Sequence, residues 1–518
     1  MLKNRYVYSV SLVVALGGFL MGFDASVISG VNRFIELEFD LSKIELGWAV
    51  ASLTLSATLA MMVAGPLSDR IGRKRVLSIA AVLYTVSAIG SAFAPSFLFL
   101  VIARMIGGLG VGASLIIAPM YIAEIAPPKI RGSLVSINQL NIVLGISVAF
   151  FTNYMILQLG KSDMAWAQAL NFDTYNWRWM LGLETLPAIF YFIGLFFVPR
   201  SPRWLVMKDQ YSEALAVFKK VNSEDNAEKA FKDAKESFEA DKDSDKRTLK
   251  DLFKPALKLV LLVGVVIGIL QQITGINAVF FYAPMIFEQS GIGTDASFVQ
   301  AILVGLTNLL FTVLAIIFID KVGRKPLLIG GVGGIAVCML VLSFAFNNAT
   351  YTLMPETISE LPAEINQQQL SPMVGVVYDN DLAFKQALSN TLGENTAQAY
   401  ESQLITASAD INATLILVSI LGFVASFAIS LGPIMWVLFS EIFPNYIRGL
   451  AISFVGLINS AVSFGVQLVF PWELANFGSS VTFLIYGVFA AAGLIFIMLV
   501  VPETKGKSLE ELEIYLAK

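Results

Sequence analysis

Twelve apolar runs, each long enough to cross a bilayer, constrain the fold of this chain more than any other feature. A helix of about 20 apolar residues covers the roughly 30 Å of hydrocarbon in a membrane. The first six runs lie at roughly 6–30, 44–66, 76–94, 97–121, 133–158 and 177–198. The second six lie at roughly 256–286, 298–319, 326–346, 411–438, 450–472 and 479–501. Because lipid cannot bond backbone polar groups, these runs predict an all-α membrane protein with twelve transmembrane helices in two six-helix bundles.

The composition excludes most other classes of protein. Of the 518 residues, 56% are hydrophobic and 14% are charged, with 35 basic against 39 acidic side chains. This near balance gives no reason to expect a nucleic-acid partner. The chain has no histidine, and its single cysteine, Cys338, lies in an apolar run. We therefore expect no disulfide framework, metal site or cofactor, and no enzyme, since no nucleophile, base and orienting group occur together.

The charged segments divide the chain into domains. Residues 1–198 form the predicted N-terminal bundle, 199–255 a polar cytoplasmic linker with short helices, 256–501 the C-terminal bundle, and 502–518 a cytoplasmic tail. The first run is long and lacks a small-residue cleavage site, so we expect a retained helix rather than a signal peptide. Lysine and arginine cluster in the short loops after the second, fourth, eighth and tenth runs, and such residues stay cytoplasmic. Both termini are then cytoplasmic.

An internal repeat supports the two halves. Asp69-Arg70-Ile71-Gly72-Arg73-Lys74 recurs as Asp320-Lys321-Val322-Gly323-Arg324-Lys325, and Glu124-Ile125-Ala126-Pro127 recurs as Glu441-Ile442-Phe443-Pro444. The spacing between the two motifs is longer in the second half. This difference locates an insertion at 347–410, which is acidic and is expected to be extracytoplasmic.

The repeated motifs predict a network of charges that closes the cytoplasmic side. Each combines a glycine turn with opposite charges at helix ends, where carboxylates and arginines can pair. Ordinary positive-inside anchoring is the alternative for any single loop. The predicted gate residues are Asp69, Arg73, Glu124, Arg131, Asp320, Arg324, Glu441 and Arg448.

Together with further motifs, these loops resemble the sugar porter family of the major facilitator superfamily. The other matching pieces are Gly22-Phe23-Asp24, Arg104 before a glycine-rich stretch, Ser201-Pro202-Arg203-Trp204, Gln271-Gln272-Ile273-Thr274-Gly275-Ile276-Asn277, Gly432-Pro433 with Trp436, and Pro502-Glu503-Thr504-Lys505-Gly506. The resemblance covers nearly the whole chain outside 347–410. The family commonly has an acid before Ser-Pro-Arg, whereas Arg200 stands here, which puts the usual pairing at the end of the sixth helix in doubt.

Amides inside the apolar runs predict a sugar site. An unbonded amide in an apolar environment costs roughly 1–3 kcal/mol, and amides donate and accept hydrogen bonds as sugar hydroxyls do. The alternative is that they only join helices. The resemblance implies that the matched positions contact a sugar. The candidate binding residues are Gln139, Ile146, Gln271, Gln272, Asn277, Phe280, Phe281, Asn308, Trp436 and Asn459. Among them, Ile146 and Phe280 are apolar where some pentose-transporting relatives are more polar or smaller, which favours a hexose.

Asp24 and Arg104 are charges deep inside predicted spans, and both lie about 9–12 Å below the same membrane surface. A buried carboxylate beside an arginine can exchange a proton, although a static ion pair is the alternative. The resemblance favours exchange, since proton-coupled sugar porters carry an acid at this position and facilitative ones usually an amide. We therefore predict a monomeric multi-pass protein, favouring a bacterial inner membrane, that imports a monosaccharide with a proton. A facilitative uniporter is the first alternative and a transporter-like sugar receptor the second.

Overall fold

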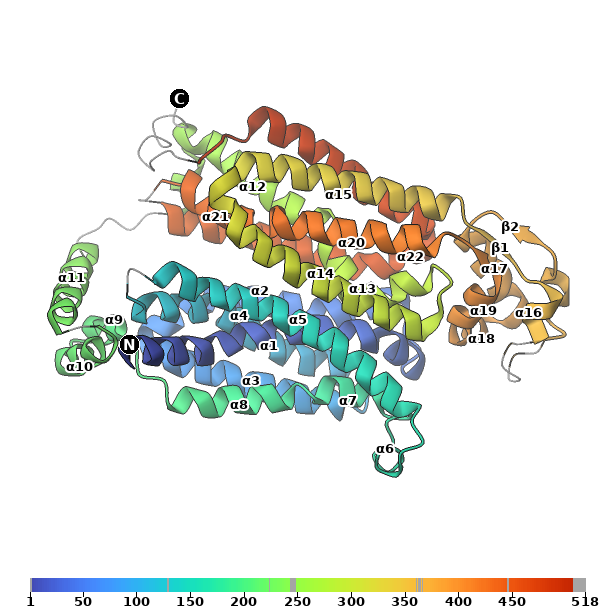
Figure 1. Cartoon of the computed structure of the whole chain (residues 1–518), viewed down its shortest axis with the longest axis horizontal. Coiled ribbons are helices and arrows are strands. Elements are labelled where there is room, and N and C mark those ends of the chain that lie inside the picture. The colour runs from blue at the N-terminus through green and yellow to red at the C-terminus, as the bar shows by residue number, and fades with distance from the viewer. Residues whose placement is uncertain are drawn as a thin grey trace. The chain divides into compact units, whose positions relative to one another are not determined.

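The structure of the chain is a computed structural model that describes residues 2–127, 130–222, 224–242, 248–359, 361, 365, 367–444 and 447–505. Helices dominate it (Figure 1). The predicted spans 1 to 6 are α1 (Leu2–Glu38), α2 (Lys43–Ile71), α3 (Arg73–Ala92), α4 (Phe97–Ile125), α5 (Arg131–Gly160), and the pair α7 (Asn176–Gly182) and α8 (Thr185–Phe196). A short helix, α6 (Ala165–Ala169), precedes that pair.

The second six spans are also helical. They are the pair α12 (Lys258–Ile273) and α13 (Ile276–Glu288), then α14 (Gly293–Val322), α15 (Arg324–Asn347), the pair α20 (Ala413–Ile429) and α21 (Leu431–Ile442), and α22 (Arg448–Val500). Eleven described helical segments are long and apolar enough to cross a membrane. The last of them, α22, has 53 residues and is interrupted at Gly478, so it covers the last two predicted runs. The predicted all-α fold is confirmed.

The repeated Asp-x-x-Gly-Arg-Lys motifs form matching turns. Gly72 separates α2 from α3 with φ 99°, and Gly323 separates α14 from α15 with φ 109°. A side chain is strained in this region of backbone space, which explains why both copies of the motif need glycine. Each arginine that follows, Arg73 or Arg324, begins the next helix.

The linker region forms three short helices, α9 (Pro202–Met207), α10 (Tyr211–Val221) and α11 (Glu224–Lys242), followed by the 3₁₀ helices η1 (Leu249–Phe253) and η2 (Pro255–Leu257). Trp204, Val217 and Phe218 lie in a small core of their own between α9, α10 and α11. The predicted linker residues 243–247 lie outside the described residues, as does 506–518 of the predicted tail.

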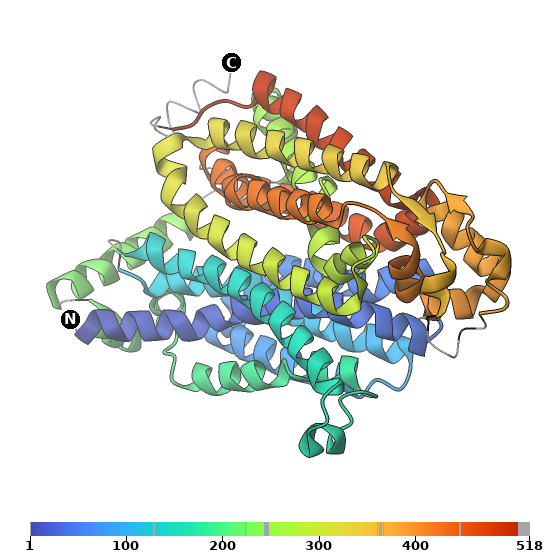
Figure 2. The same ribbon diagram turned by 45° about the vertical axis from the view of Figure 1, so that its right-hand side comes forward.

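The insertion is a compact α/β element. It contains β1 (Thr350–Thr352), α16 (Pro355–Ser359), η3 (Ser371–Met373), β2 (Val377–Tyr378), α17 (Asp381–Leu392), α18 (Glu394–Ala399), α19 (Glu401–Ser408) and β3 (Ala409–Asp410). The strands form an antiparallel sheet in the order β2-β1-β3, with Tyr351 paired to Tyr378 on one side and Ala409 on the other. Figures 1 and 2 show these elements gathered beyond the ends of α13 and α20.

The chain divides into two compact units. Unit 1 comprises residues 1–27, 52–149 and 168–248, and unit 2 comprises 28–51, 150–167 and 249–518. In unit 1, α3 packs on α4, α7 and α8 around buried aliphatic residues with Tyr84, Tyr121 and Tyr191. In unit 2, α15 packs on α20 and α22, and α12 packs on α22. The division into two six-helix bundles with a separate linker stays a prediction, because the compact units follow other boundaries.

Candidate transport and coupling site

Three buried ionisable side chains lie together inside unit 1. Asp24 on α1, Arg104 on α4 and Glu184 at the start of α8 are 2%, 1% and 2% exposed. Arg104 Nη1 donates a hydrogen bond to Asp24 Oδ1 over 3.4 Å, and Glu184 interacts electrostatically with both residues. Within the described part of the chain, Asp24 Oδ2 and Glu184 Oε1 accept no hydrogen bond. The predicted meeting of Asp24 and Arg104 therefore occurs, and Glu184 joins them.

Small residues on α4 let Asp24 come close to that helix. A Cβ at Gly107 would lie 2.8 Å from Asp24 Oδ2 and 2.4 Å from Ser87 Oγ, so even an alanine would force the groups apart. Two carboxyl groups here interact electrostatically with one guanidinium. Isolated charges are costly to bury in a membrane protein, so a group of two acids and one base favours holding a proton. This arrangement can take up and release a proton inside the membrane.

Four of the predicted sugar-binding amides are joined by hydrogen bonds within unit 2. Asn459 Nδ2 donates to Gln271 Oε1 over 2.8 Å, and Gln272 Nε2 donates to Gln271 Oε1 and Asn459 Oδ1 over 3.1 and 3.2 Å. Asn277 Nδ2 donates to Gln272 Oε1 over 2.8 Å. Gln271, Gln272 and Asn459 are buried, whereas Asn277 is half-buried. We call Gln271, Gln272, Asn277 and Asn459 the amide cluster.

Gly275 sets the path of the chain through this cluster. It separates α12 from α13 with φ 90°, and a Cβ there would lie 2.7 Å from the ring of Tyr486. The break places Gln271 and Gln272 at the end of one helix and Asn277 at the start of the next. The broken helix thus brings three amides to one place.

Two polar residues that the sequence analysis did not select extend the cluster. Asn277 Nδ2 and Gln467 Nε2 both donate to Ser463 Oγ, over 2.7 and 2.8 Å. The hydroxyl of Tyr282 donates to the backbone carbonyl of Gln467 over 2.8 Å. Ser463 and Gln467 lie four and eight residues after Asn459, on the same face of α22. That spacing is the signal by which they could have been found.

The remaining sugar candidates are not part of these hydrogen bonds. Phe280 and Phe281 are buried on α13, and Asn308 is buried on α14. Trp436 on α21 is 45% exposed and lies beside Gly456 of α22. Gln139 and Ile146 belong to α5 in unit 1, where Gln139 is exposed and Ile146 is buried.

Predicted gate charges are paired within each unit. In unit 1, Arg73 contacts Glu124 over 3.0 Å and Asp69 over 2.8 Å, and Ser201 donates to the second carboxylate oxygen of Glu124. The indole of Trp204 donates to the carbonyl of Asp69 over 3.1 Å, which fastens α9 to the turn. Arg73 and Glu124 are largely buried, so removing either one of them would be costly.

Unit 2 repeats this arrangement with different supporting residues. Arg324 contacts Glu441 over 2.8 Å, and Thr504 donates to the second oxygen of Glu441 over 2.6 Å. The carboxylate of Glu503 accepts from the backbone amides of Arg324 and Lys325, each over 3.1 Å. Thr504 of the Pro-Glu-Thr motif therefore bonds the carboxylate of Glu441 as Ser201 bonds that of Glu124.

Two predicted gate arginines have other partners. Arg131 donates to the carbonyl of Ala126 over 3.4 Å, and Arg448 donates to the carbonyl of Phe443 over 3.0 Å. These bonds tie the start of α5 and α22 to the preceding loop rather than to a carboxylate. The side chain of Asp320 lies outside the described part of the structure. Arg200, which replaces the family's usual acid, contacts Glu213 of α10 over 3.4 Å at the surface.

The fold and these sites define a multi-span membrane transporter of the major facilitator type, not an enzyme. The chain belongs to the sugar transporter family, since the model of that family, described as "Sugar (and other) transporter", matches residues 10–356 and 395–516. Among similar proteins, the arabinose-proton symporter of Bacillus subtilis is 33% identical over 98% of this chain and 94% of the relative. The D-xylose-proton symporter of Escherichia coli is 35% identical over 99% and 96%.

Solved structures give the same fold. The inward open conformation of the xylose transporter XylE from E. coli matches with a TM-score of 0.74 at 34% identity, over 98% of this chain and all of that chain.

A third similar protein by sequence, the glucose transport protein of Synechocystis, is 33% identical over 98% of this chain and 97% of its own length. The middle of the insertion, residues 357–394, is the internal stretch that the family model leaves unmatched.

Proposed function

We propose that this protein is a proton-coupled symporter that imports a monosaccharide by alternating access, acting as a monomer in a bacterial inner membrane. The observation that carries the proposal is the buried group of Asp24, Arg104 and Glu184. A uniporter has no need to bury two carboxyl groups against one arginine. The relatives whose names state arabinose-proton or xylose-proton symport support the same mechanism.

The sugar is proposed to bind to the amide cluster, with Trp436 offering an apolar face to the ring. Amides that hydrogen-bond one another can exchange those bonds for bonds to sugar hydroxyls at little net cost. Asn277 and Trp436 are the members with exposed surface, so they are the groups from which exchange would begin. Gln139, Ile146, Phe280, Phe281 and Asn308 are proposed to complete the site.

A hexose is the proposed substrate, because Ile146 and Phe280 are apolar and buried. The relatives include transporters named for pentoses and for glucose, so a pentose is the second candidate. A competition panel decides between them. Membrane vesicles take up one labelled hexose in the presence of unlabelled pentoses and hexoses, and the best competitor identifies the class.

The insertion is proposed to face the exterior, with the loops of the gate pairs and both termini in the cytoplasm. A cysteine at the exposed position Ser371, in a Cys338→Ala background, tests this orientation. An impermeant maleimide should label it in intact spheroplasts. Labelling only after lysis would show that the insertion faces the cytoplasm.

Proton coupling is tested by adding sugar to de-energised cells and following external pH. Symport should alkalinise the medium as sugar enters. A protein that takes up sugar without alkalinisation is the uniporter, and one that binds sugar without uptake is the receptor.

A further inference from the structure

The insertion packs around its own core. Tyr351 and Phe384 stack with ring centroids 5.4 Å apart, Tyr378 meets the same ring edge-on at 5.6 Å, and Leu353 and Leu404 are fully buried beside them. Residues from β1, β2, α17 and α19 all contribute to this core. The insertion is therefore a folded element rather than an extended loop.

One side of the insertion is anchored to the last transmembrane segment. The buried carboxylate of Asp381, at the start of α17, accepts hydrogen bonds from the backbone amide and the hydroxyl of Ser479, over 2.9 and 2.8 Å. Ser479 follows the break at Gly478, so Asp381 caps the start of the final span. Charge and hydrogen bonding both stabilise a carboxylate at a helix N-terminus.

The other side of the insertion is bonded to the end of α13. Lys385 contacts Glu401 over 2.9 Å and donates to Gln289 Oε1 over 2.6 Å, and Gln289 Nε2 donates to Glu401 over 3.3 Å. Burial alone raises the pKa of Glu401, but Lys385 and Lys43, with hydrogen bonds from Lys385 and Gln289, hold it at about 2. Glu401 is therefore a carboxylate at physiological pH.

A single arginine of α1 joins this arrangement. Arg33 contacts Glu288 of α13 over 2.8 Å, and its Nη2 donates to Gln403 of α19 over 3.3 Å. Its Nη1 also donates to Thr294, whose hydroxyl lies 3.4 Å from that of Ser402 on α19. Gln403 thus links the insertion directly to α1, a helix of the first repeat.

The same end of unit 2 holds other close contacts between elements of the two repeats. Asn32 Nδ2 donates to the carbonyl of Phe281 over 2.8 Å. A Cβ at Gly47 of α2 would lie only 2.0 Å from the carbonyl oxygen of Leu468 on α22. At these points α1 is in direct contact with α13, and α2 with α22.

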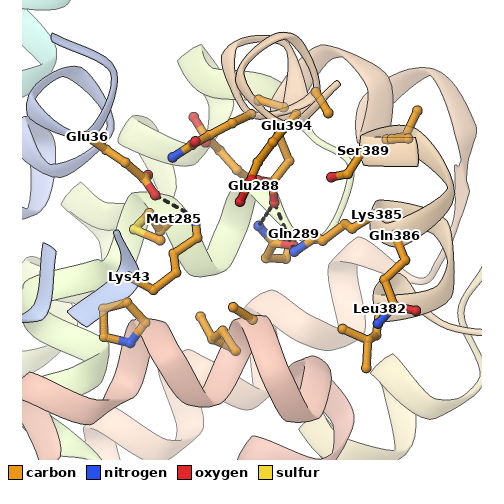
Figure 3. A pocket seen from close by; sticks show the side chains of 18 of the residues that line it. Glu36, Lys43, Met285, Glu288, Gln289, Leu382, Lys385, Gln386, Ser389 and Glu394 are labelled. Carbon is orange, nitrogen blue, oxygen red and sulfur yellow. Dashed lines mark hydrogen bonds and ion pairs between the residues drawn. The ribbon is translucent and has the colours of Figure 1, made fainter. Parts of the chain in front are cut away.

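A cavity of about 500 Å³ lies behind the insertion, lined by α1, α2, α13, α22 and the insertion helices (Figure 3). The three cations that line it are each paired with a carboxylate that also lines it: Arg33 with Glu288, Lys43 with Glu36, and Lys385 with Glu401. The exposed Glu394 also lines it, so four carboxylates face three cations. Because the insertion and α1 both contribute to its wall, separating them would widen it.

We propose that the insertion is a latch on the extracytoplasmic mouth, with Gln403 of α19 as its hook on Arg33. The bonds from Ser479 to Asp381 attach the insertion to the second repeat. The bond from Arg33 to Gln403 attaches α1 of the first repeat to the insertion. This inference rests on the proposed alternating access, in which the outer ends of the two repeats must part to admit sugar. The latch then sets how often the mouth opens without touching sugar or proton sites.

Opposite substitutions at Gln403 test the latch in the full chain reconstituted in lipid nanodiscs. Gln403→Ala removes the hook, and amide hydrogen exchange in residues 28–38 should rise roughly two- to tenfold, the factor for one net hydrogen bond. Gln403→Glu adds a charge opposite Arg33, and exchange there should fall. Ser371→Ala and Ser371→Glu are the matched controls on an exposed part of the insertion. Both should leave amide exchange in residues 28–38 unchanged.

A second variant is designed to open the extracytoplasmic mouth. Gly47→Trp cannot fit against Leu468, so it should hold the helix ends apart and speed exchange throughout α19 several-fold. Protection of α17, anchored by Asp381, should stay at the parent level in every variant and reports that the insertion is folded. Equal exchange in both Gln403 variants, or an unchanged α19 in Gly47→Trp, overturns the latch. These measurements need neither sugar nor a proton gradient, so failure of the proposed symport would leave their outcome intact.

Discussion

Arg104 donates a hydrogen bond to Asp24 across 3.4 Å, joining α4 to α1 where both side chains are shut off from solvent. The distance is long for a charge-assisted bond, which is typically about 2.7–2.9 Å. Glu184 interacts electrostatically with the same guanidinium. A pair held loosely beside a second acid is suited to changing partners when a proton arrives.

Replacing Asp24 with asparagine should abolish gradient-driven accumulation and leave sugar binding intact. The amide mimics the protonated acid permanently, so no proton can be released at this position. Uptake driven by an imposed proton gradient, measured beside equilibrium sugar binding, separates the two effects. Asp163→Asn, at an exposed loop position, is the control. Sugar concentrated by Asp24→Asn to the parent level would make the uniporter the better interpretation.

Removing the hydroxyl of Ser463 should weaken sugar binding several-fold. Ser463→Ala leaves the amides of Asn277 and Gln467 without a shared acceptor, a loss of about 0.5–1.5 kcal/mol for each net hydrogen bond. Ser463→Thr keeps the hydroxyl and should restore affinity. The matched control is Ser453→Ala on the exposed side of the same helix, where the hydroxyl bonds only the carbonyl of Gly449 among the described contacts. Parent-like binding by Ser463→Ala would mean that the amide cluster joins helices rather than positions sugar.

Hydropathy and the repeated motifs were enough to predict the fold, because length and apolarity alone decide which segments can cross a bilayer. The matched depths of Asp24 and Arg104 also predicted their contact, since rise per residue is fixed in a helix. Glu184 was missed although it stands inside the apolar run at 177–198. As the only acid in that run, it was itself the signal.

Other parts of the site depend on contacts between distant segments that periodicity does not encode. Ser201 and Thr504 support Glu124 and Glu441 from 77 and 63 residues away. The contact from Arg33 to Gln403 spans 370 residues and crosses into an insertion with no counterpart in the repeat. Such pairings follow from packing of the whole unit rather than from local sequence.

The two gate pairs should show strong energetic coupling in double-mutant cycles of transport rate. Arg73→Ala leaves the largely buried Glu124 without its arginine, and Glu124→Ala leaves Arg73 only Asp69 as an ion-pair partner among the described contacts, so the double variant should be no worse than the more damaging single one. The same pattern is expected for Arg324 with Glu441. The exposed pair of Arg200 and Glu213 is the internal comparison, where coupling of about 0–1 kcal/mol is expected. Additive effects at Arg73 and Glu124 would remove them from the gate.

The latch should resist acidification of the medium, because the pKa of Glu401 is held at about 2, below its ordinary 4.5. A carboxyl with a lowered pKa stabilises the folded arrangement above its ordinary pKa, and this stabilisation fades only as the pH falls from about 4.5 toward 2. The difference in α19 exchange between the parent and Glu401→Gln, corrected for intrinsic rates, should therefore be constant from about pH 7 to pH 5 and shrink below that. Asp379→Asn, at an exposed position of the insertion, should match the parent throughout. A difference that already disappears between pH 7 and pH 5 would show that Glu401 does not hold Lys385 and Gln289 as a carboxylate, and that protons outside the cell act on the latch itself.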